Sequence, residues 1–222
     1  LESRGESHEV IVVDDGSRDG TAAWVEEFCR KNRSVRLIRL PRNRGKGAAV
    51  RTGMMSAAGE YVLFTDADLS TPIAEANRLL DPLQNGYDVA IGSRGLNREW
   101  ISIHQSQIRE NAGKFFNLCL RAITGLPFRD TQCGFKAFRK QAARRIFALQ
   151  TIDGFGFDAE LLYLARKLGY RTLEVPVHWA HSEGTKVRML RDGVRMATDL
   201  LKIRWNDLRG RYSEASQRPP AA

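Results

Sequence analysis

Short apolar runs alternate with helical patterns along the first half of the chain. Each run is long enough for a strand and is followed by a turn and by apolar residues at helical spacing. This alternation is typical of βαβ units, which build a parallel sheet with helices on its faces. The predicted strands are Val10–Val13, Val35–Leu40, Tyr61–Thr65 and Tyr87–Ile91, and we expect the first of them to be buried. The first predicted helix is capped by Asp19 or Thr21 and runs to about Lys31, with Trp24, Val25 and Phe28 on its inner face. The next predicted helices are Lys46–Ala57 and Pro72–Leu83.

The second half has longer helical segments and shorter strands. Thr172–Val177 is expected at a sheet edge, because Pro176 has no N–H for a second neighbour. Met189–Leu208 is amphipathic and carries many Lys and Arg side chains, and the tail from Ser213 is expected to be disordered. The remaining predicted elements are helices over Gln105–Thr124, Lys140–Leu149 and Asp158–Leu168 and a short strand over Gly134–Phe138.

Composition points to one globular domain with an acidic partner. The chain has 222 residues, 42% of them hydrophobic, and a formal net charge of +9. Such a charge favours binding to nucleic acid, anionic lipid or a phosphorylated substrate, without choosing among them. The cysteines, Cys29, Cys119 and Cys133, are odd in number and scattered, which predicts reduced thiols. No apolar run is long enough to span a bilayer, and residues 1–9 do not resemble a signal peptide.

Acidic turns follow two of the predicted strands. Asp66-Ala67-Asp68 stands directly after Tyr61–Thr65, and Asp14-Asp15-Gly16-Ser17 follows Val10–Val13. The carboxyl ends of parallel strands form the ligand crevice of such sheets. Two carboxylates separated by one residue can hold a hard divalent cation, and the other turn can accept hydrogen bonds from a base or ribose. Each turn could also be a simple helix cap, but together they outline a nucleotide-diphosphate site.

A glycine-rich basic turn opens the second predicted helix. Asn43-Arg44-Gly45-Lys46-Gly47 places cations at a helix N-terminus, an arrangement that suits phosphate. The spacing and the residue after Lys46 differ from those of a Walker loop. In isolation, a surface basic loop explains this segment equally well.

These motifs, in this order, resemble the family 2 inverting glycosyltransferases. The resemblance covers about Glu9 to Lys202 and is strongest to the dolichyl-phosphate glucosyltransferases and the related dolichyl-phosphate mannose synthases. It implies a GT-A type nucleotide-diphospho-sugar transferase fold, α/β with a mostly parallel sheet flanked by helices. The segments that carry it are 12–21, Asn43–Gly47, Thr65–Asp68, Gly92-Ser93-Arg94 and Arg129–Lys136, and the glucosyl branch is favoured by Arg129–Lys136, Gly156–Leu162 and Glu183–Lys186.

The sequence departs from the family at two points. Family members begin with a strand that ends in a Pro-Ala-Tyr-Asn-Glu-like segment, and no counterpart precedes Glu9. We therefore expect the first strand to be lacking, with residues 1–188 as an N-terminally truncated catalytic domain, 189–211 as a basic amphipathic helix and 212–222 as a disordered tail. Ser70 stands where the mannose synthases have a Gln that contacts the metal.

The resemblance implies a role for each group of motif residues. Asp66 and Asp68 would bind Mg²⁺ or Mn²⁺, which neutralises the leaving nucleotide. Asp130 is assigned to the catalytic set, and it could instead be a structural cap or orient the acceptor. The donor, with UDP-glucose favoured, would contact Asp14, Asp15, Gly16, Ser17, Arg44, Gly45, Lys46, Asp66 and Ala67; the acceptor phosphate would contact Arg94, Arg109 and Lys186; and the catalytic set would be Asp66, Asp68, Arg94, Arg109 and Asp130.

The implied reaction moves a hexose, glucose by preference, onto a polyprenyl or dolichyl phosphate lipid. We expect a cytoplasmic protein attached peripherally to the inner face of the membrane, with the 189–211 helix at the interface. Three other functions stay open: transfer to a sugar hydroxyl in polysaccharide synthesis, a non-catalytic nucleotide-binding fragment, and a nucleic-acid-binding module. The last has net charge in its favour but no recognisable motif, so we expect no nucleic-acid partner.

Overall fold

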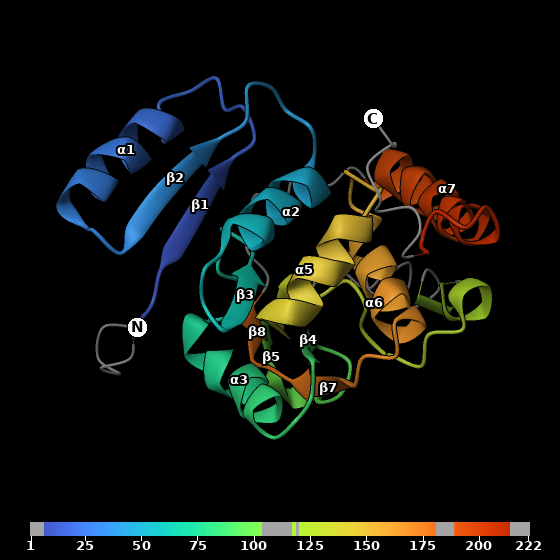
Figure 1. Ribbon diagram of the computed structural model, residues 1–222. Helices are drawn as coiled ribbons and strands as arrows, with labels where there is room; N and C mark the ends of the chain where they lie inside the picture. The colour runs from blue at the N-terminus through green and yellow to red at the C-terminus, as the bar shows by residue number, and fades with distance from the viewer. Residues whose placement is uncertain (1–6, 104–116, 119, 181–188, 214–222) are drawn as a thin grey trace.

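A computed structural model describes residues 7–103, 117–118, 120–180 and 189–213. The first lobe pairs β1 (Val10–Asp14) in parallel with β2 (Val35–Arg39), and α1 (Thr21–Lys31) packs on β2. Among the described residues β1 pairs only with β2, so β1 is half-buried rather than buried as predicted. Figure 1 shows this lobe at the left, beside α2 (Lys46–Ser56).

The main sheet has four strands in the order β3-β6-β4-β7. β4 and β7 are parallel, whereas β6 is antiparallel to both β3 and β4. β3, β4 and β7 therefore run in one direction, as the expectation of a mostly parallel sheet requires, and β6 is the exception in this sheet. The strands are β3 (Tyr61–Thr65), β6 (Phe135–Arg139), β4 (Val89–Ser93) and β7 (Thr172–Pro176), with β7 at the edge as Pro176 predicts.

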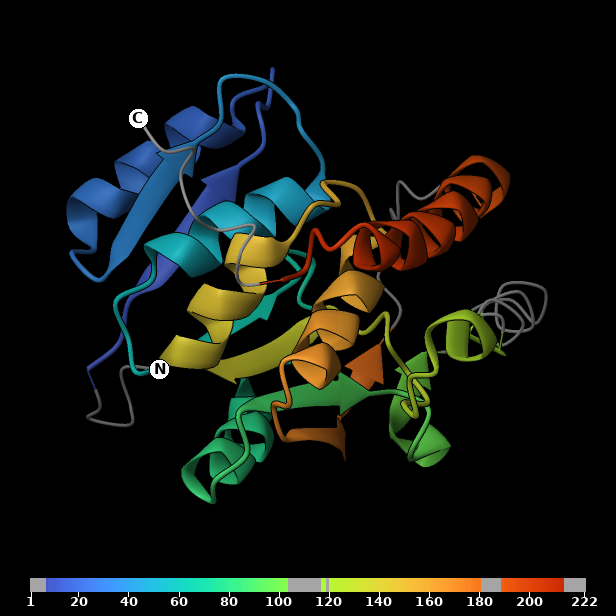
Figure 2. The same ribbon diagram turned by 45° about the vertical axis from the view of Figure 1, so that its right-hand side comes forward.

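Helices cover the two faces of this sheet. α2, α5 (Lys140–Leu149) and α6 (Phe157–Lys167) lie in a row on one face, and α7 (Met189–Leu208) packs against α6 (Figures 1 and 2). The other face is covered by α3 (Ala76–Gln84), which follows a 3-10 turn over Ile73–Glu75. β5 (Ile101–Ile103) and β8 (Trp179–Ala180) form a separate two-stranded parallel sheet. β5 directly follows a 3-10 turn over Arg98–Trp100.

Alternating side chains build a separate apolar core on each face. Val89 and Ile91 of β4 point into the core beneath α5 and α6, while Ala90 points into the core beneath α3. This alternation follows from the two-residue period of a strand. The predicted inner face of α1 is partly wrong: Val25 is buried, but Trp24 is 70% exposed and Phe28 43% exposed. Both rings stay exposed because α1 covers only the narrow β1–β2 pair, and they stack on each other.

Most predicted elements agree with the structure to within two residues. The Gln105–Thr124 helix falls largely outside the described residues, although 120–124 are helical. Cys29 and Cys133 are free thiols as predicted, and Cys119 lies outside the described part, as do residues 214–222 of the predicted disordered tail. No helix in the described part of the chain is long and apolar enough to cross a membrane.

A buried carboxylate ties the chain after α5 to the chain after α7. Glu160 of α6 is fully buried and accepts hydrogen bonds from the Thr151 N–H (3.0 Å) and hydroxyl (2.6 Å), the Ile152 N–H (2.9 Å) and the Tyr212 hydroxyl (2.6 Å). Each donor would be left without its partner if this side chain were removed. Glu160 therefore fixes the turn that leads into α6.

Replacing Glu160 with Ala should destabilise the fold by about 3 kcal/mol or more, because buried donors lose their acceptor. Urea unfolding followed by circular dichroism measures this loss. Glu27→Ala is the matched control, since the Glu27 side chain is 52% exposed on α1, and we expect a change within about 0.5 kcal/mol. Equal losses in the two variants would contradict the role given to Glu160.

Candidate functional site

Loops at the ends of β1 and β3 meet the N-terminus of α2. Both carboxylate oxygens of Asp15 accept backbone N–H groups, from Arg44 and Gly45, at 2.8 Å each. Gly16 has φ 75°, and a Cβ on it would lie 2.7 Å from the Arg42 carbonyl carbon. Only glycine permits so close an approach. Asp15 and Gly16 thus join the first acidic turn to the basic turn Asn43–Gly47, which is distant from it along the chain.

A hollow of about 520 Å³ lies beside this junction. Asp14 stands behind it, 6% exposed, and its Oδ1 accepts the Ser17 N–H at 3.0 Å. Hydrogen bonds from Ser17 lower the pKa of Asp14, so this carboxylate is ionised. Its Oδ2 is buried and accepts no hydrogen bond, and lies 3.8 Å from Arg39 Nε. The hollow is lined by Gly16, Ser17, Arg18, Arg39, Leu40, Pro41, Arg42 and Asn43.

Lys46 reaches from α2 to the acidic turn after β3. Its Nζ lies 2.6 Å from Asp66 Oδ1. Burial would lower the pKa of Lys46, but the carboxylates of Asp158 and Asp66 outweigh burial and raise it, with a smaller contribution from Asp68. Lys46 is therefore a firmly charged ammonium among three carboxylates. The predicted neighbours Lys46 and Asp66 come together, and Asp158 joins them.

The N-terminus of α2 faces protein rather than an open crevice. The Ala48 N–H donates to the Asp153 carbonyl at 3.2 Å, and Arg44 Nη2 binds the Asp153 carboxylate at 3.1 Å. A Cβ on Gly45 would lie 2.5 Å from the Asp153 oxygen. The Lys46 side chain, rather than the backbone of this turn, is thus the group that faces the carboxylates.

The second acidic turn carries an exposed carboxylate. Asp68 Oδ1 accepts the Ser70 N–H at 3.0 Å and is otherwise open to solvent, as is Ala67. The Asp66 carboxylate lies directly over Gly134, where a Cβ would come within 2.1 Å of Asp66 Oδ2. In the described residues no group of three His, Cys, Asp or Glu side chains could hold a metal. The Asp66–Asp68 pair suits a cation that takes its other ligands from phosphate and water.

A buried ion pair lies behind these loops and was missed by the sequence predictions. Lys136 of β6 and Asp158 of α6 are in direct contact, 0% and 3% exposed at their side chains, and Lys136 Nζ also donates to the Cys133 carbonyl at 2.6 Å. Buried charges are held only when paired. The available signal was a lysine in the apolar strand Phe135–Arg139, which needs a carboxylate partner.

Arg94 and Asp130 form a second paired site at the end of β4. The guanidinium binds the carboxylate in two-point fashion, Nε at 2.6 Å and Nη2 at 2.8 Å, and the Arg94 N–H donates to Asp130 at 3.0 Å. Burial would raise the pKa of Asp130, but Arg94 outweighs it and lowers the pKa. Arg94 also lies over the Trp179 ring, and Glu174 accepts the Asp130 N–H at 2.8 Å.

The pairs are electrostatic neighbours. Against the effect of burial, Asp130 raises the pKa of Arg94 and Asp158 adds a smaller contribution, while Arg94 lowers the pKa of Asp130 and Lys136 adds a smaller contribution. Asp130 holds Arg94 through Nε and Nη2, and within the described part of the chain Nη1 makes no hydrogen bond. Arg109 and Lys186, the other residues predicted to bind the acceptor, lie outside the described residues.

Comparisons with known proteins agree with this geometry. The Glycosyl transferase family 2 pattern matches residues 1–147. Proteins named dolichyl-phosphate beta-glucosyltransferase are similar to the chain: those of Dictyostelium discoideum (37% identical, 92% of this chain and 64% of that protein), Homo sapiens (38%, 93% and 66%) and Saccharomyces cerevisiae (34%, 96% and 69%). The chain spans about two thirds of the length of these relatives.

Solved structures show the same fold at low identity. Glucosyl-3-phosphoglycerate synthase from Mycobacterium tuberculosis with UDP has a TM-score of 0.62 at 20% identity, covering 87% of this chain and 68% of that one. Mannosyl-3-phosphoglycerate synthase from Rubrobacter xylanophilus has a TM-score of 0.61 at 20% identity, covering 100% and 70%. The expected GT-A type fold is thereby confirmed. With the family pattern matching well over half of the residues, the chain belongs to glycosyl transferase family 2.

Proposed function

We propose that this chain transfers glucose from UDP-glucose to a dolichyl or other polyprenyl phosphate, with inversion at the sugar carbon. The observation that carries the proposal is the row of paired charges formed by Lys46–Asp66, Lys136–Asp158 and Arg94–Asp130. It joins the acidic turn after β3 to the basic group after β4. An anionic donor and an anionic acceptor can both be bound along such a row, and the similar proteins carry the name of this reaction.

The nucleotide would occupy the hollow beside the first acidic turn. Gly16 and Ser17 line it together with Arg18, Arg39 and Arg42, which supply positive charge for a diphosphate. Asp14 and Asp15 hold the two walls and so shape the hollow. Structures of glucosyl-3-phosphoglycerate synthase include complexes with UDP and, in two cases, with UDP-glucose and Mn²⁺.

Mg²⁺ or Mn²⁺ fits the Asp66–Asp68 turn. Two protein carboxylate oxygens are enough for a cation that also binds a substrate diphosphate. When bound, the metal would neutralise charge on the departing nucleotide. Lys46 contacts Asp66 Oδ1, so this ammonium balances the carboxylate and is positioned to interact with a neighbouring phosphate.

The acceptor needs orientation more than activation. A phosphate monoester is already anionic near neutral pH, so the attacking oxygen does not require a strong base. Arg94 is fixed by Asp130 and Trp179 and is 28% exposed at its side chain, so it can present a guanidinium nitrogen to that phosphate. Arg109 and Lys186 complete the proposed acceptor set by resemblance.

The proposed lipid acceptor requires contact with a membrane, and α7 supplies a suitable surface. Leu200 and Ile203 are buried against the domain, whereas Leu201, Trp205 and Leu208 are 62%, 55% and 77% exposed. These exposed residues share one side of the helix, and Arg209 lies over the Trp205 ring. An apolar side flanked by cations is typical of an interfacial helix. We propose peripheral attachment through this side of α7.

Labelled glucose should pass from UDP-glucose to polyprenyl phosphate in detergent with Mn²⁺, scored by label in the organic phase. Asp68→Asn should lower the rate by about 100-fold or more, because the charge that holds the metal is halved. Asp81→Asn, an exposed carboxylate on α3, is the control and should keep full activity. GDP-mannose is tested in parallel, and the absence of transfer from either donor would contradict the proposed reaction.

Gly134→Ala should weaken Mn²⁺-dependent UDP binding by about tenfold, because the new Cβ displaces the Asp66 carboxylate and metal ligands tolerate little displacement. Isothermal titration calorimetry with and without Mn²⁺ measures the effect. Gly20→Ala is the matched control, since a Cβ there meets no atom within 4 Å. Unchanged affinity in Gly134→Ala would argue against Asp66 as a metal ligand.

Arg94→Lys should raise the KM for polyprenyl phosphate by about tenfold and leave that for UDP-glucose unchanged. Lysine keeps the charge but loses the two-point contact with Asp130 and the planar donor pair. Steady-state kinetics with each substrate varied in turn separates the two constants. Arg30→Lys, 76% exposed on α1, is the control. A rise confined to the UDP-glucose KM would move Arg94 to the donor site.

A further inference from the structure

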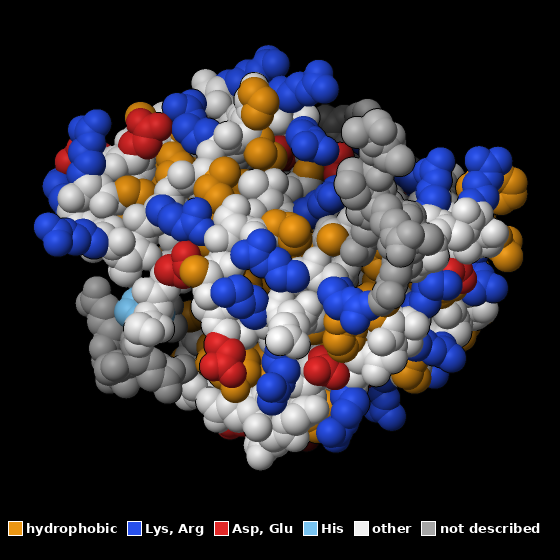
Figure 3. Space-filling model, viewed as in Figure 1, with side chains coloured by type: hydrophobic (Ala, Val, Ile, Leu, Met, Phe, Trp, Pro, Cys, Tyr) orange, Lys and Arg blue, Asp and Glu red, His pale blue; other side chains and the backbone are white. Residues whose placement is uncertain are grey.

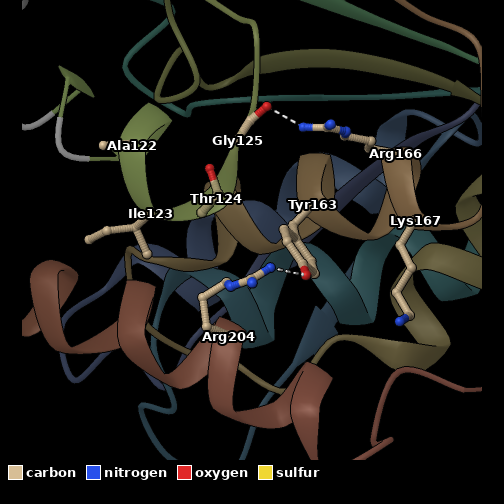
Figure 4. A pocket seen from close by; sticks show the side chains of 8 residues that line it. All are labelled: Ala122, Ile123, Thr124, Gly125, Tyr163, Arg166, Lys167 and Arg204. Atoms are coloured by element: carbon tan, nitrogen blue, oxygen red, sulfur yellow. Dashed lines mark hydrogen bonds between the residues drawn. The ribbon is translucent and has the colours of Figure 1, made fainter.

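A second hollow of about 520 Å³ opens between α6, α7 and the segment 122–125. Figure 4 shows the side chains that surround it, with Arg166 and Lys167 coming from α6 and Arg204 from α7. Ala122 and Ile123 give one wall an apolar character. The full lining is Ala122, Ile123, Thr124, Gly125, Tyr163, Arg166, Lys167 and Arg204.

The hollow has an excess of positive charge. Lys167 contacts Asp207, whose carboxylate also accepts the Tyr163 hydroxyl. Arg166 and Arg204 contact only uncharged partners among these residues: Arg166 Nη1 donates to the Gly125 carbonyl, and Arg204 Nη1 donates to the Tyr163 hydroxyl at 2.9 Å. Each guanidinium keeps further N–H groups, because it carries five donors. The contacts orient both cations without neutralising them.

This hollow is separate from the proposed transfer site. Asp158, in the first turn of α6, belongs to the transfer site, whereas Arg166 and Lys167 lie in its last turn. A helix rises 1.5 Å per residue, so the two sites are about 13 Å apart along α6. Donor and acceptor binding therefore leave the hollow unexplained.

The hollow adjoins the exposed apolar side of α7. Arg204 lines the hollow and directly precedes Trp205, and Leu201 and Leu208 stand one turn away from Arg204 on either side. Figure 3 shows Lys and Arg side chains next to hydrophobic ones over α7, at the right of the view. A ligand with a phosphate group attached to an apolar body would match both surfaces at once.

We propose that this hollow binds the phosphate headgroup of an anionic membrane phospholipid while Leu201, Trp205 and Leu208 enter the acyl boundary. The proposal rests on the membrane attachment given above and adds a specific headgroup site to it. The neighbouring apolar side favours a lipid over free phosphate, since a soluble anion would leave that side in water. The site is non-catalytic and orients the domain on the membrane.

The test measures sedimentation of this chain with phosphatidylcholine vesicles that contain or lack phosphatidylglycerol. Arg166→Gln/Arg204→Gln should bind anionic vesicles about tenfold more weakly, because each cation near such a surface contributes up to about fivefold. Arg30→Gln/Lys31→Gln removes the same charge from α1, where the side chains are 76% and 73% exposed, and should change binding by less than about twofold. Equal losses in the two variants would overturn the proposal.

A second variant avoids the contacts of Arg204 with Tyr163. Ala122→Glu puts a carboxylate into the hollow from an exposed position. Ala23→Glu is the control, because it adds a carboxylate at an exposed position of α1, away from the hollow. Only Ala122→Glu should weaken binding to anionic vesicles. An equal effect of Ala23→Glu, or no effect of Ala122→Glu, would overturn the site. Displacement from vesicles by inorganic phosphate, and not by chloride of equal ionic strength, would assign the hollow to free phosphate instead.

Two further measurements separate this site from the proposals on which it rests. Leu201→Ser/Trp205→Ser should lose binding to both kinds of vesicle, which tests attachment through α7 by itself. Glucose transfer to polyprenyl phosphate in detergent should stay unchanged in Arg166→Gln/Arg204→Gln. Loss of transfer in that variant would place the hollow in the reaction and overturn a separate role.

Discussion

The buried pair of Lys136 and Asp158 is the interaction on which the candidate site depends. Neither charge can lie in the core alone, since an unpaired buried charge destabilises a fold by several kcal/mol. The pair therefore fixes β6, an inner strand of the four-stranded sheet, against the first turn of α6. The helix N-terminus adds favourable partial charge for Asp158. Lys46, Arg94 and Asp130 of the site all interact electrostatically with this pair.

Lys46–Asp66 and Arg94–Asp130 both lie within electrostatic reach of this pair: Lys46 and Arg94 interact with Asp158, and Asp130 interacts with Lys136. Each carboxylate of the row has a cation beside it, so charges of opposite sign alternate. Removal of one charge would therefore alter its neighbours as well as itself. A donor diphosphate and an acceptor phosphate, both anionic, could approach such a row only where a cation is partly exposed, as Lys46 and Arg94 are.

Close backbone contacts determine how the loops meet, and glycine makes these contacts possible. A Cβ on Gly47 would lie 2.6 Å from the Ile152 carbonyl oxygen, and one on Gly45 would clash with Asp153. α2 therefore starts directly against the turn that Glu160 holds in place. The stability of the turn and the position of Lys46 are thus linked through one loop.

The sequence indicates which strand ends carry chemistry but not which groups pair. Asp66 and Asp68 could be predicted because an acidic turn directly follows an apolar strand. The partner of Arg94 could not, since Asp130 is 36 positions away and strand order decides their meeting. Lys136 was overlooked because the apolar pattern of its strand predicts burial, and burial alone argues against a charge. The antiparallel direction of β6 could not be predicted either, because the two-residue period of a strand is identical in both directions.

The C-terminal helix illustrates a further limit of periodicity. α7 has apolar residues on two opposite sides, one buried through Leu200 and Ile203 and one exposed through Leu201, Trp205 and Leu208. A sequence pattern records both sides as amphipathic character and cannot say which one meets the domain. Packing against α6 resolves this, because Tyr163 and Lys167 bind Asp207 and so fix the rotation of the helix. The same contacts that bury one side of α7 therefore expose the other and set Arg204 at the edge of the hollow.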